Sequence, residues 1–391
     1  MLNGNKGEVT MLVLLDLSAA FDTIDHQILI ERLEKTHGIT GTALQWFKSY
    51  LCDRTQSVII NDTESASKKL KFGVPQGSKL GPILFNSYIA PLSDVAQKHN
   101  IDDQKYADDE QLLLAFTPNI SSTSDAICRM ENCIKDIRLF LHRNKLCNNG
   151  DKTEIIVLGP KSKLKDLGVH AITVDNVSIA MADKVRNLGV ILDKNLTMEN
   201  QVVKMCQAAY LNIRNIARIR VSMNYDDTKT VVNALVTPHL DYGNGLLYGV
   251  SGKLIKKLQV AQNSAVRLIE KLKKHDHVTD KRKDLHWLPI PARIEYKLMT
   301  LTWKIVNNQA PKYLSDLINN KTYCRLLRNS NKMLLNIPRL EGNNSWGNRA
   351  FCISSPTLWN KLPPHIRQKR TLDSFKKSLK THLFNIHYNL R

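Results

Sequence analysis

Apolar residues form short continuous or alternating runs in the first half of the chain and recur at helical intervals in the second half. Residues 10–15 are a continuous apolar run that ends at Asp16, which is typical of a strand buried on both faces with a carboxylate at its exposed end. Another apolar run, at 112–116, comes directly after Asp108 and Asp109, so these two acids are expected at the tip of a hairpin.

Further elements follow from the same patterns. A hairpin is predicted from strands at 56–60 and 70–72 across a polar turn at 61–69, and a second hairpin at 185–193. Helices are predicted at 28–38, 43–51, 83–96 and 124–140, and longer basic helices at 201–220, 227–240, 253–272 and 372–384. The change to long basic helices near residue 199 predicts a boundary between domains at 1–198 and 199–306, and an Asn-richer segment at 307–344 marks off a third at 307–391. The fold expected overall is α+β.

Charge is divided unequally along the 391 residues, whose formal net charge is +20. Residues 1–200 contain 23 Lys and Arg against 25 Asp and Glu, whereas residues 201–391 contain 33 against 11. The basic second half favours a polyanionic partner such as nucleic acid; a solvated basic surface is the alternative.

The seven cysteines are scattered without zinc spacing, and no apolar run is long enough to cross a membrane. An intracellular protein, nuclear or cytoplasmic, with no membrane partner is therefore expected.

Paired acids at a strand end are most often a simple turn, but Asp16 changes the interpretation of Asp108 and Asp109. Neighbouring strands of one sheet would bring all three carboxylates together, where they would repel one another without a cation. Oxygen ligands of this kind suit Mg²⁺, and two such ions suit nucleotidyl transfer. The loop GVPQGSKLGP at 73–82 has a fixed backbone path, and Gly77 leaves room for a base or sugar; an ordinary connecting loop is the alternative.

The order of five motifs closely resembles the palm of reverse transcriptases, and in particular the jockey-like type of non-LTR retrotransposons. The motifs are LLDLSAAFDTIDH at 14–26, GVPQGS at 73–78 with LGP at 80–82, YADD at 106–109, DKTE at 151–154 and LGV at 188–190. The strings LHWLP at 285–289, PKYL at 311–314 and PTLWNKLP at 356–363 also resemble the tail of such elements. The resemblance implies a polymerase palm, an antiparallel sheet with packed helices, followed by a mostly helical thumb and a C-terminal region.

The resemblance also implies roles for individual residues. Asp16, Asp108 and Asp109 match the metal-binding triad for two Mg²⁺ ions, with Mn²⁺ as a substitute, and Lys152 matches a lysine that protonates the pyrophosphate leaving group. Further matches are the ribose gate at Phe21, the nucleotide and template loop at Gln76 and Gly77, and the primer grip at Leu188, Gly189 and Val190. The implied partners are an RNA template, a DNA primer, their hybrid, and dNTPs.

The chain departs from the family pattern at two places. Glu110 stands where Thr or Ser is usual, and the strand at 102–105 is polar, so hairpin packing or metal geometry is expected to change. The first palm strand begins near residue 10, so most of the fingers and an endonuclease domain are expected to be absent. A catalytically silent nucleic-acid-binding protein is therefore the rival hypothesis, and a structural core without nucleic acid is a third.

Overall fold

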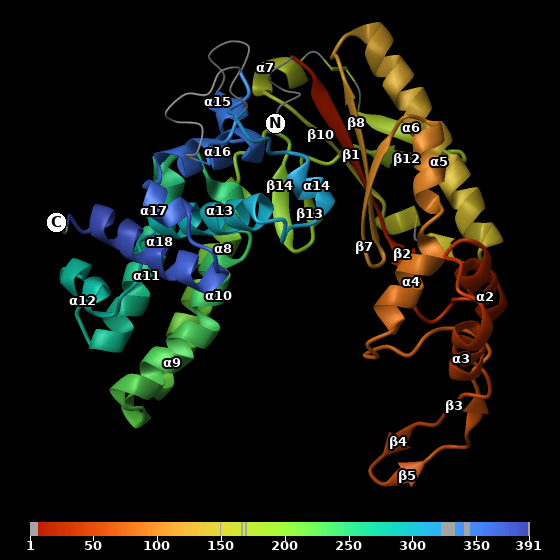
Figure 1. Ribbon diagram of the computed structural model, residues 1–391, viewed down its shortest axis with the longest axis horizontal. Helices are drawn as coiled ribbons and strands as arrows, with labels where there is room; N and C mark the ends of the chain where they lie inside the picture. The colour runs from red at the N-terminus through yellow and green to blue at the C-terminus, as the bar shows by residue number, and fades with distance from the viewer. Residues whose placement is uncertain are drawn as a thin grey trace. The chain divides into compact units, whose positions relative to one another are not determined.

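A computed structural model describes residues 7–148, 150–165, 167–168, 170–321, 333–339 and 345–389 (Figure 1). Part of the predicted C-terminal domain at 307–391 lies outside these residues. The chain forms two compact units, Gly7–Leu188 and Gly189–Arg391, called the N-terminal and C-terminal units below. The break between the two units falls after Leu188, and the domains at 1–198, 199–306 and 307–391 stay predictions.

The N-terminal unit is built on a four-stranded antiparallel sheet with the order β10-β1-β8-β7. Its strands are β1 (Val9–Leu15), β7 (Asp102–Tyr106), β8 (Asp109–Phe116) and β10 (Glu154–Leu158). The expectation for β1 is confirmed, since it is paired on both edges and Met11 and Val13 are fully buried. The α+β class with an antiparallel sheet is also confirmed.

Helices cover this sheet, and α5 and α6 pack against β7 and β8 (Figure 1). The helices of the unit are α2 (His26–Lys35), α3 (Gly41–Leu51), α4 (Gly81–Ile89), α5 (Leu92–Lys98), α6 (Ile120–Arg143) and α7 (Lys161–Leu164), with the 3-10 turn η1 (Gly150–Lys152). The single helix expected at 83–96 is wrong, because the chain breaks between α4 and α5 at Ala90 and Pro91. A proline at this position has no N–H to donate to the preceding turn.

The hairpin expected at 56–72 is also different in detail. Its strands are β3 (Thr55–Gln56), β4 (Ile59–Ile60), β5 (Thr63–Glu64) and β6 (Lys68–Lys69), and the turn is only Asn61–Asp62 rather than 61–69. Both turn residues have positive φ, 45° and 62°, which is what a two-residue turn matched to strand twist requires. The short pairs β2 (Leu17–Ser18) with β9 (Cys147–Asn148), and β11 (Ala171–Val174) with β12 (Val177–Ala180), complete the pairing within this unit.

The C-terminal unit is mostly helical. Its longer helices are α8 (Glu199–Ile219), α9 (Tyr225–Leu235), α11 (Gly252–Glu270), α13 (Ile290–Val306), α16 (Phe351–Lys361) and α18 (Leu372–His387). Shorter elements are η2 (Arg220–Ser222), α10 (Thr237–Asp241), η3 (Asn244–Leu247), α12 (Thr279–Asp284), α14 (Lys312–Ser315), α15 (Ser345–Asn348) and α17 (Pro364–Arg367). The strands β13 (Lys184–Asn187) and β14 (Val190–Asp193) flank the break between the units.

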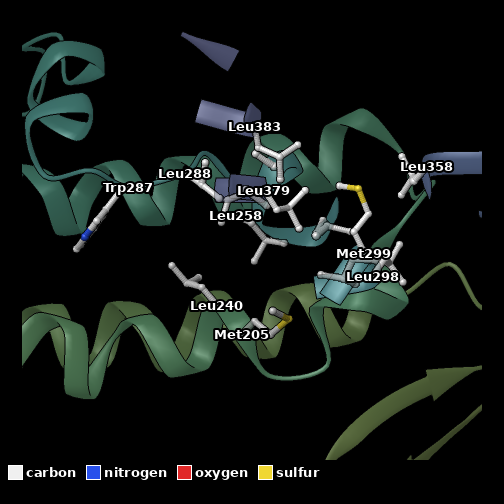
Figure 2. Close-up of a cluster of buried hydrophobic side chains, with 14 of the residues drawn as sticks. Met205, Leu240, Leu258, Trp287, Leu288, Leu298, Met299, Leu358, Leu379 and Leu383 are labelled. Atoms are coloured by element: carbon white, nitrogen blue, oxygen red, sulfur yellow. The ribbon is translucent and has the colours of Figure 1, made fainter. Parts of the chain in front are cut away.

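One hydrophobic core holds these helices together (Figure 2). Leucine and methionine side chains from α8, α11, α13 and α18 meet at its centre, where Leu258 and Leu379 are fully buried. Phe375 stacks on Trp303 and packs against Trp359, with both ring centroids 5.8 Å away. Because α16 and α18 supply two of these three rings, both helices belong to the core of this unit.

Candidate active site

The register of the central strands brings Asp16 and the paired acids to one end of the sheet. Leu15 lies opposite Glu110 in the β1–β8 pairing, so Asp16 follows β1 at the point where Asp109 begins β8. Asp108 lies in the two-residue turn between β7 and β8, beside Ala107, whose φ of 54° is unusual for a residue other than glycine. The predicted convergence of a strand end with a hairpin tip is confirmed by this register.

The three carboxylates interact electrostatically. Partial desolvation raises the pKa of the otherwise exposed Asp109, and the charges of Asp108 and Asp16 raise it further. Lys152 balances part of this charge, since its Nζ lies 3.1 Å from Asp16 Oδ2. This ion pair is weak, because the Lys152 side chain is 66% exposed and surface pairs contribute little. The site therefore carries excess negative charge that a cation would relieve.

The donor set suits a hard divalent cation, because carboxylate oxygens are the ligands that Mg²⁺ prefers. As the side chains lie, however, no group of three or more Asp, Glu, His or Cys residues in the described parts of the chain could hold one ion. The three carboxylates thus have the right chemistry and the right position on the sheet for a divalent cation. To bind one ion together, their side chains must move closer to one another.

Glu110 does not join this group. Alternate residues of β8 face opposite sides of the sheet, so Glu110 lies on the buried side with Leu112 and Leu114. It is 2% exposed, and neither carboxylate oxygen has a hydrogen-bond partner in the described structure. Burial raises its pKa to about 8, and Lys105 only partly opposes this rise. The departure from the family pattern therefore introduces a neutral buried acid rather than another metal ligand.

The polar strand β7 has its own buried network, which explains why Lys105 leaves Glu110 unpaired. Lys105 Nζ donates to Ser93 Oγ at 2.6 Å and Ala90 O at 3.2 Å, and lies 3.4 Å from Asp103 Oδ2. Ser93 Oγ in turn donates to Asp103 at 2.6 Å. The polar sequence at 102–105 is thus accommodated by contacts with α5 and the end of α4.

Two of the predicted motifs come together around Phe21. Val74 N donates to Phe21 O at 2.9 Å, and Gly73 N donates to Ile24 O at 2.8 Å. The Phe21 ring stacks on Phe85 with centroids 4.8 Å apart, which fixes its orientation. Gly73 has a φ of 86°, and a Cβ there would lie 2.9 Å from Asp22 O, so only glycine allows this approach.

Gln76 and Gly77 lie in the exposed part of the same loop. Gln76 Nε2 donates to both carboxylate oxygens of Asp22, at 3.0 and 3.1 Å, and Gly77 has a φ of 79° with open space where a side chain would be. His26 Nε2 lies 2.7 Å from Gly73 O. Asp22 and His26 stand inside the first motif, but no role was predicted for either of them. Among the described residues, no hydrogen bond joins this loop to the carboxylates.

The LGV motif lies where the two units meet along the chain. Leu188 and Gly189 both have positive φ, 45° and 83°, and form the turn between β13 and β14. Lys204 of α8 donates to Gly189 O at 3.1 Å, and Val190 belongs to the core of the C-terminal unit. The primer-grip assignment of these residues stays a prediction.

The C-terminal unit has a groove between α8 and α11 with a volume of about 890 Å³, called the basic groove below. Its floor is apolar and includes the exposed side chains of Tyr210 and Leu211. Its cations are Arg214 from α8 and Lys253, Lys256 and Lys257 from α11. An apolar floor with a cationic rim suits the sugars and phosphates of a nucleic-acid strand.

Helices that could cross a membrane are absent from the described residues, because none is both long and apolar enough.

Curated proteins similar to this chain are polymerases of mobile elements. The chain is 27% identical over 293 residues to the probable RNA-directed DNA polymerase from transposon BS of Drosophila melanogaster, covering 72% of this chain and 31% of that protein. It is 22% identical to the RNA-directed DNA polymerase from mobile element jockey of the same species, covering 69% and 29%. The chain thus spans about a third of the length of these relatives.

A solved structure of telomerase from Candida albicans, in complex with a fragment of telomeric RNA, shares 15% sequence identity with a TM-score of 0.33, covering 71% of this chain and 49% of that one. This likeness is too low to assign the fold.

A family match covers the part of the chain that contains the carboxylates. Residues 2–192 match the reverse transcriptase (RNA-dependent DNA polymerase) family, which includes Asp16, the Asp108–Asp109 pair and Lys152. Divalent metal dependence is general in this family. Together with the jockey-type relatives, this match supports a jockey-like reverse transcriptase of the non-LTR retrotransposon type over residues 2–192.

Proposed function

We propose that this chain is an RNA-directed DNA polymerase that adds dNTPs to a primer 3′-hydroxyl on an RNA template. The observation that carries the proposal is the register of β1 and β8, which places Asp16 beside the Asp108–Asp109 pair at one end of the sheet. In this proposal the N-terminal unit corresponds to the palm and the C-terminal unit supplies the thumb.

Asp16, Asp108 and Asp109 would hold two Mg²⁺ ions. When bound, such ions activate the primer hydroxyl and neutralise charge on the departing pyrophosphate. The primer 3′-hydroxyl would lose its proton to water, and its oxygen would bond to the α-phosphorus of the dNTP. The bond between that phosphorus and the α–β bridging oxygen would break, which releases pyrophosphate. The carboxylates position the reacting groups, and the raised pKa of Asp109 favours cation binding at higher pH, when this group is ionised.

Lys152 would act as the acid that protonates the pyrophosphate. Its Nζ is already within the site, 3.1 Å from Asp16, and its side chain is exposed enough to exchange partners when a cation neutralises Asp16. A protonated lysine can donate to a leaving oxygen in the transition state, which is a general acid role.

The loop at 73–78 would bind the incoming nucleotide. The stacked Phe21 ring would exclude a ribose 2′-hydroxyl, and Gln76 and Gly77 would contact the nucleotide and template. Asp22 is a positioning residue in this proposal, because it holds the Gln76 amide by two hydrogen bonds.

The C-terminal unit would hold the RNA–DNA hybrid. Leu188, Gly189 and Val190 would grip the primer end, and the basic groove would follow the hybrid backbone. The four cations of the groove form no ion pair with a described residue, so they are available to phosphates. Binding is therefore expected to weaken steeply with salt.

Primer extension tests this proposal. The purified chain with primed RNA, dNTPs and Mg²⁺ should extend the primer, and Asp108→Ala should reduce the rate by at least about 100-fold, as losses of electrostatic stabilisation in active sites do. Asp102→Ala is the matched control, because Asp102 lies on the same hairpin with an exposed side chain, and it should extend normally.

Two outcomes would contradict the proposal. One is an absence of extension by the unchanged chain with Mg²⁺ or Mn²⁺, together with salt-sensitive RNA binding that survives Asp108→Ala. That result would support the rival hypothesis of a catalytically silent nucleic-acid-binding protein. The other is equal extension by the Asp108→Ala and Asp102→Ala variants, which would show that the hairpin carboxylates have no catalytic role.

A further inference from the structure

The LHWLP string at 285–289 lines a cavity that the polymerase proposal does not use. The cavity has a volume of about 570 Å³ and lies within the C-terminal unit, between α9, α10, α13, α18 and the segment before α13. It is called the Trp287 pocket below. Its volume is within the range of about 300–1,000 Å³ that is usual for small-ligand sites. The pocket lies outside residues 2–192, which match the reverse transcriptase family.

The pocket is cationic. Lys229 from α9, Lys297 from α13 and Lys380 from α18 line it, and none of them forms an ion pair with another described residue. Its one lining carboxylate among the described residues, Asp241, is paired through both oxygens with Arg293. Three lysines from three helices thus surround a cavity whose single acid is already neutralised, which favours an anionic ligand.

The wall formed by Trp287 is fixed in place. Tyr388 Oη donates to Trp287 O at 2.7 Å, and Gln262 Nε2 donates to Leu288 O at 2.9 Å. Ile290 N donates to Gln259 Oε1 at 2.9 Å. These bonds hold the backbone from Trp287 to Ile290, so the pocket wall does not need to reorganise when a ligand enters.

The Trp287 indole also provides the pocket with an unused hydrogen-bond donor. Trp303 and Trp359 donate their indole N–H groups to backbone carbonyls at 3.0 and 2.9 Å, whereas the Trp287 indole has no acceptor among the described residues. Figure 2 shows its nitrogen at the end turned away from the labelled leucines. The Trp287 N–H is open to the cavity and is free to donate to a ligand there.

We propose that the Trp287 pocket binds a nucleoside monophosphate unit, either free or at the end of an RNA strand. The three lysines would contact the phosphate, because charge-assisted bonds to phosphate oxygens are strong. The Trp287 N–H would donate to a ring-nitrogen acceptor on the edge of the base. This site is separate from the carboxylates of the N-terminal unit, and its ligand requires no divalent cation.

Calorimetric titration in EDTA tests the site in the full chain. The probes are AMP, a 5′-phosphorylated RNA oligonucleotide and the same oligonucleotide without its terminal phosphate. Saturable binding of AMP is expected, and Lys297→Glu with Lys380→Glu should weaken it by at least about tenfold, since two charged contacts are reversed. Lys273→Glu with Lys274→Glu makes the same change of charge on an exposed loop that does not line the pocket. This control variant should weaken AMP binding by less than about twofold.

Trp287→Phe keeps an apolar ring but removes the indole N–H, so it should weaken AMP binding while unfolding stays unchanged. Preference for the phosphorylated oligonucleotide over both AMP and the unphosphorylated oligonucleotide would identify a strand end as the source of the ligand, because the basic groove binds both oligonucleotides alike. AMP binding without a difference between the two oligonucleotides would identify the free nucleotide. The proposal is overturned if AMP and both oligonucleotides fail to saturate at millimolar concentration, or if the pocket and control variants bind equally. Asp108→Ala should strongly reduce primer extension but leave AMP binding unchanged. Absence of AMP binding would therefore contradict the Trp287 pocket proposal alone, and absence of extension by the unchanged chain would contradict the polymerase proposal alone.

Discussion

Glu110 provides a direct test of how the sheet is packed beside the active site. The carboxyl group is buried on the helix-covered face without a hydrogen-bond partner, and its pKa is raised to about 8. At neutral pH the folded chain therefore holds this group protonated, whereas in the unfolded chain it ionises near its ordinary pKa of 4.5. Glu110→Gln keeps the size of the side chain and removes the titration.

The direction of the Glu110 pKa shift determines how stability changes with pH. A carboxyl whose pKa is higher in the folded state contributes its full stability below pH 4.5 and loses it as the pH rises towards 8. Each pH unit between these values lowers the free energy of unfolding by about 1.4 kcal/mol. The unchanged chain should therefore lose about 3–4 kcal/mol between pH 5 and pH 8 relative to the Glu110→Gln variant.

Paired urea unfolding measures this difference. Both proteins are unfolded in EDTA at pH 5, 6, 7 and 8, so that every other titrating group affects both equally and cancels in the difference. The free energy of unfolding of the unchanged chain should fall relative to that of the variant as the pH rises. Parallel curves would refute the reasoning, because they would mean that Glu110 is solvated or paired when the chain is folded.

Three further predictions concern packing and binding. Gly73→Ala should destabilise the N-terminal unit more than Gly77→Ala does, as measured by thermal unfolding. Both alanines acquire backbone strain of about 1–3 kcal/mol at positive φ. Only the alanine at position 73 also places its Cβ 2.9 Å from a backbone oxygen. Phe375→Ala should cost the C-terminal unit about 3–5 kcal/mol in urea unfolding, since a fully buried ring between two tryptophans leaves a cavity; a loss below 1 kcal/mol would contradict that packing. Replacing the three lysines of the basic groove by Gln should reduce the slope of log affinity against log salt by about 2–3, measured by anisotropy with a labelled hybrid; an unchanged slope would show that nucleic acid binds elsewhere. The replaced residues are Lys253, Lys256 and Lys257.

The sequence by itself determined the elements that carry the active site. A continuous apolar run ending at Asp16 and a hairpin tip at Asp108 and Asp109 are local patterns, because strand and turn preferences depend on near neighbours in the chain. The helices after residue 199 were likewise predicted from the helical spacing of apolar residues. The break between α4 and α5 at Pro91, and the short turn at Asn61–Asp62, were also local features, but their positions depend on a competition between neighbouring residues that the pattern alone did not resolve.

Only the tertiary structure decided what several side chains face. The pairing register sets Asp109 towards solvent and Glu110 towards α6, so neighbouring acids become one exposed carboxylate and one buried neutral acid. Asp22 gains its contact with Gln76 from a residue 54 positions away, and Trp287 gains its cavity from four helices. These environments arise from contacts between distant segments, and desolvation, which shifts a pKa or leaves a polar atom unpaired, exists only once those segments have packed.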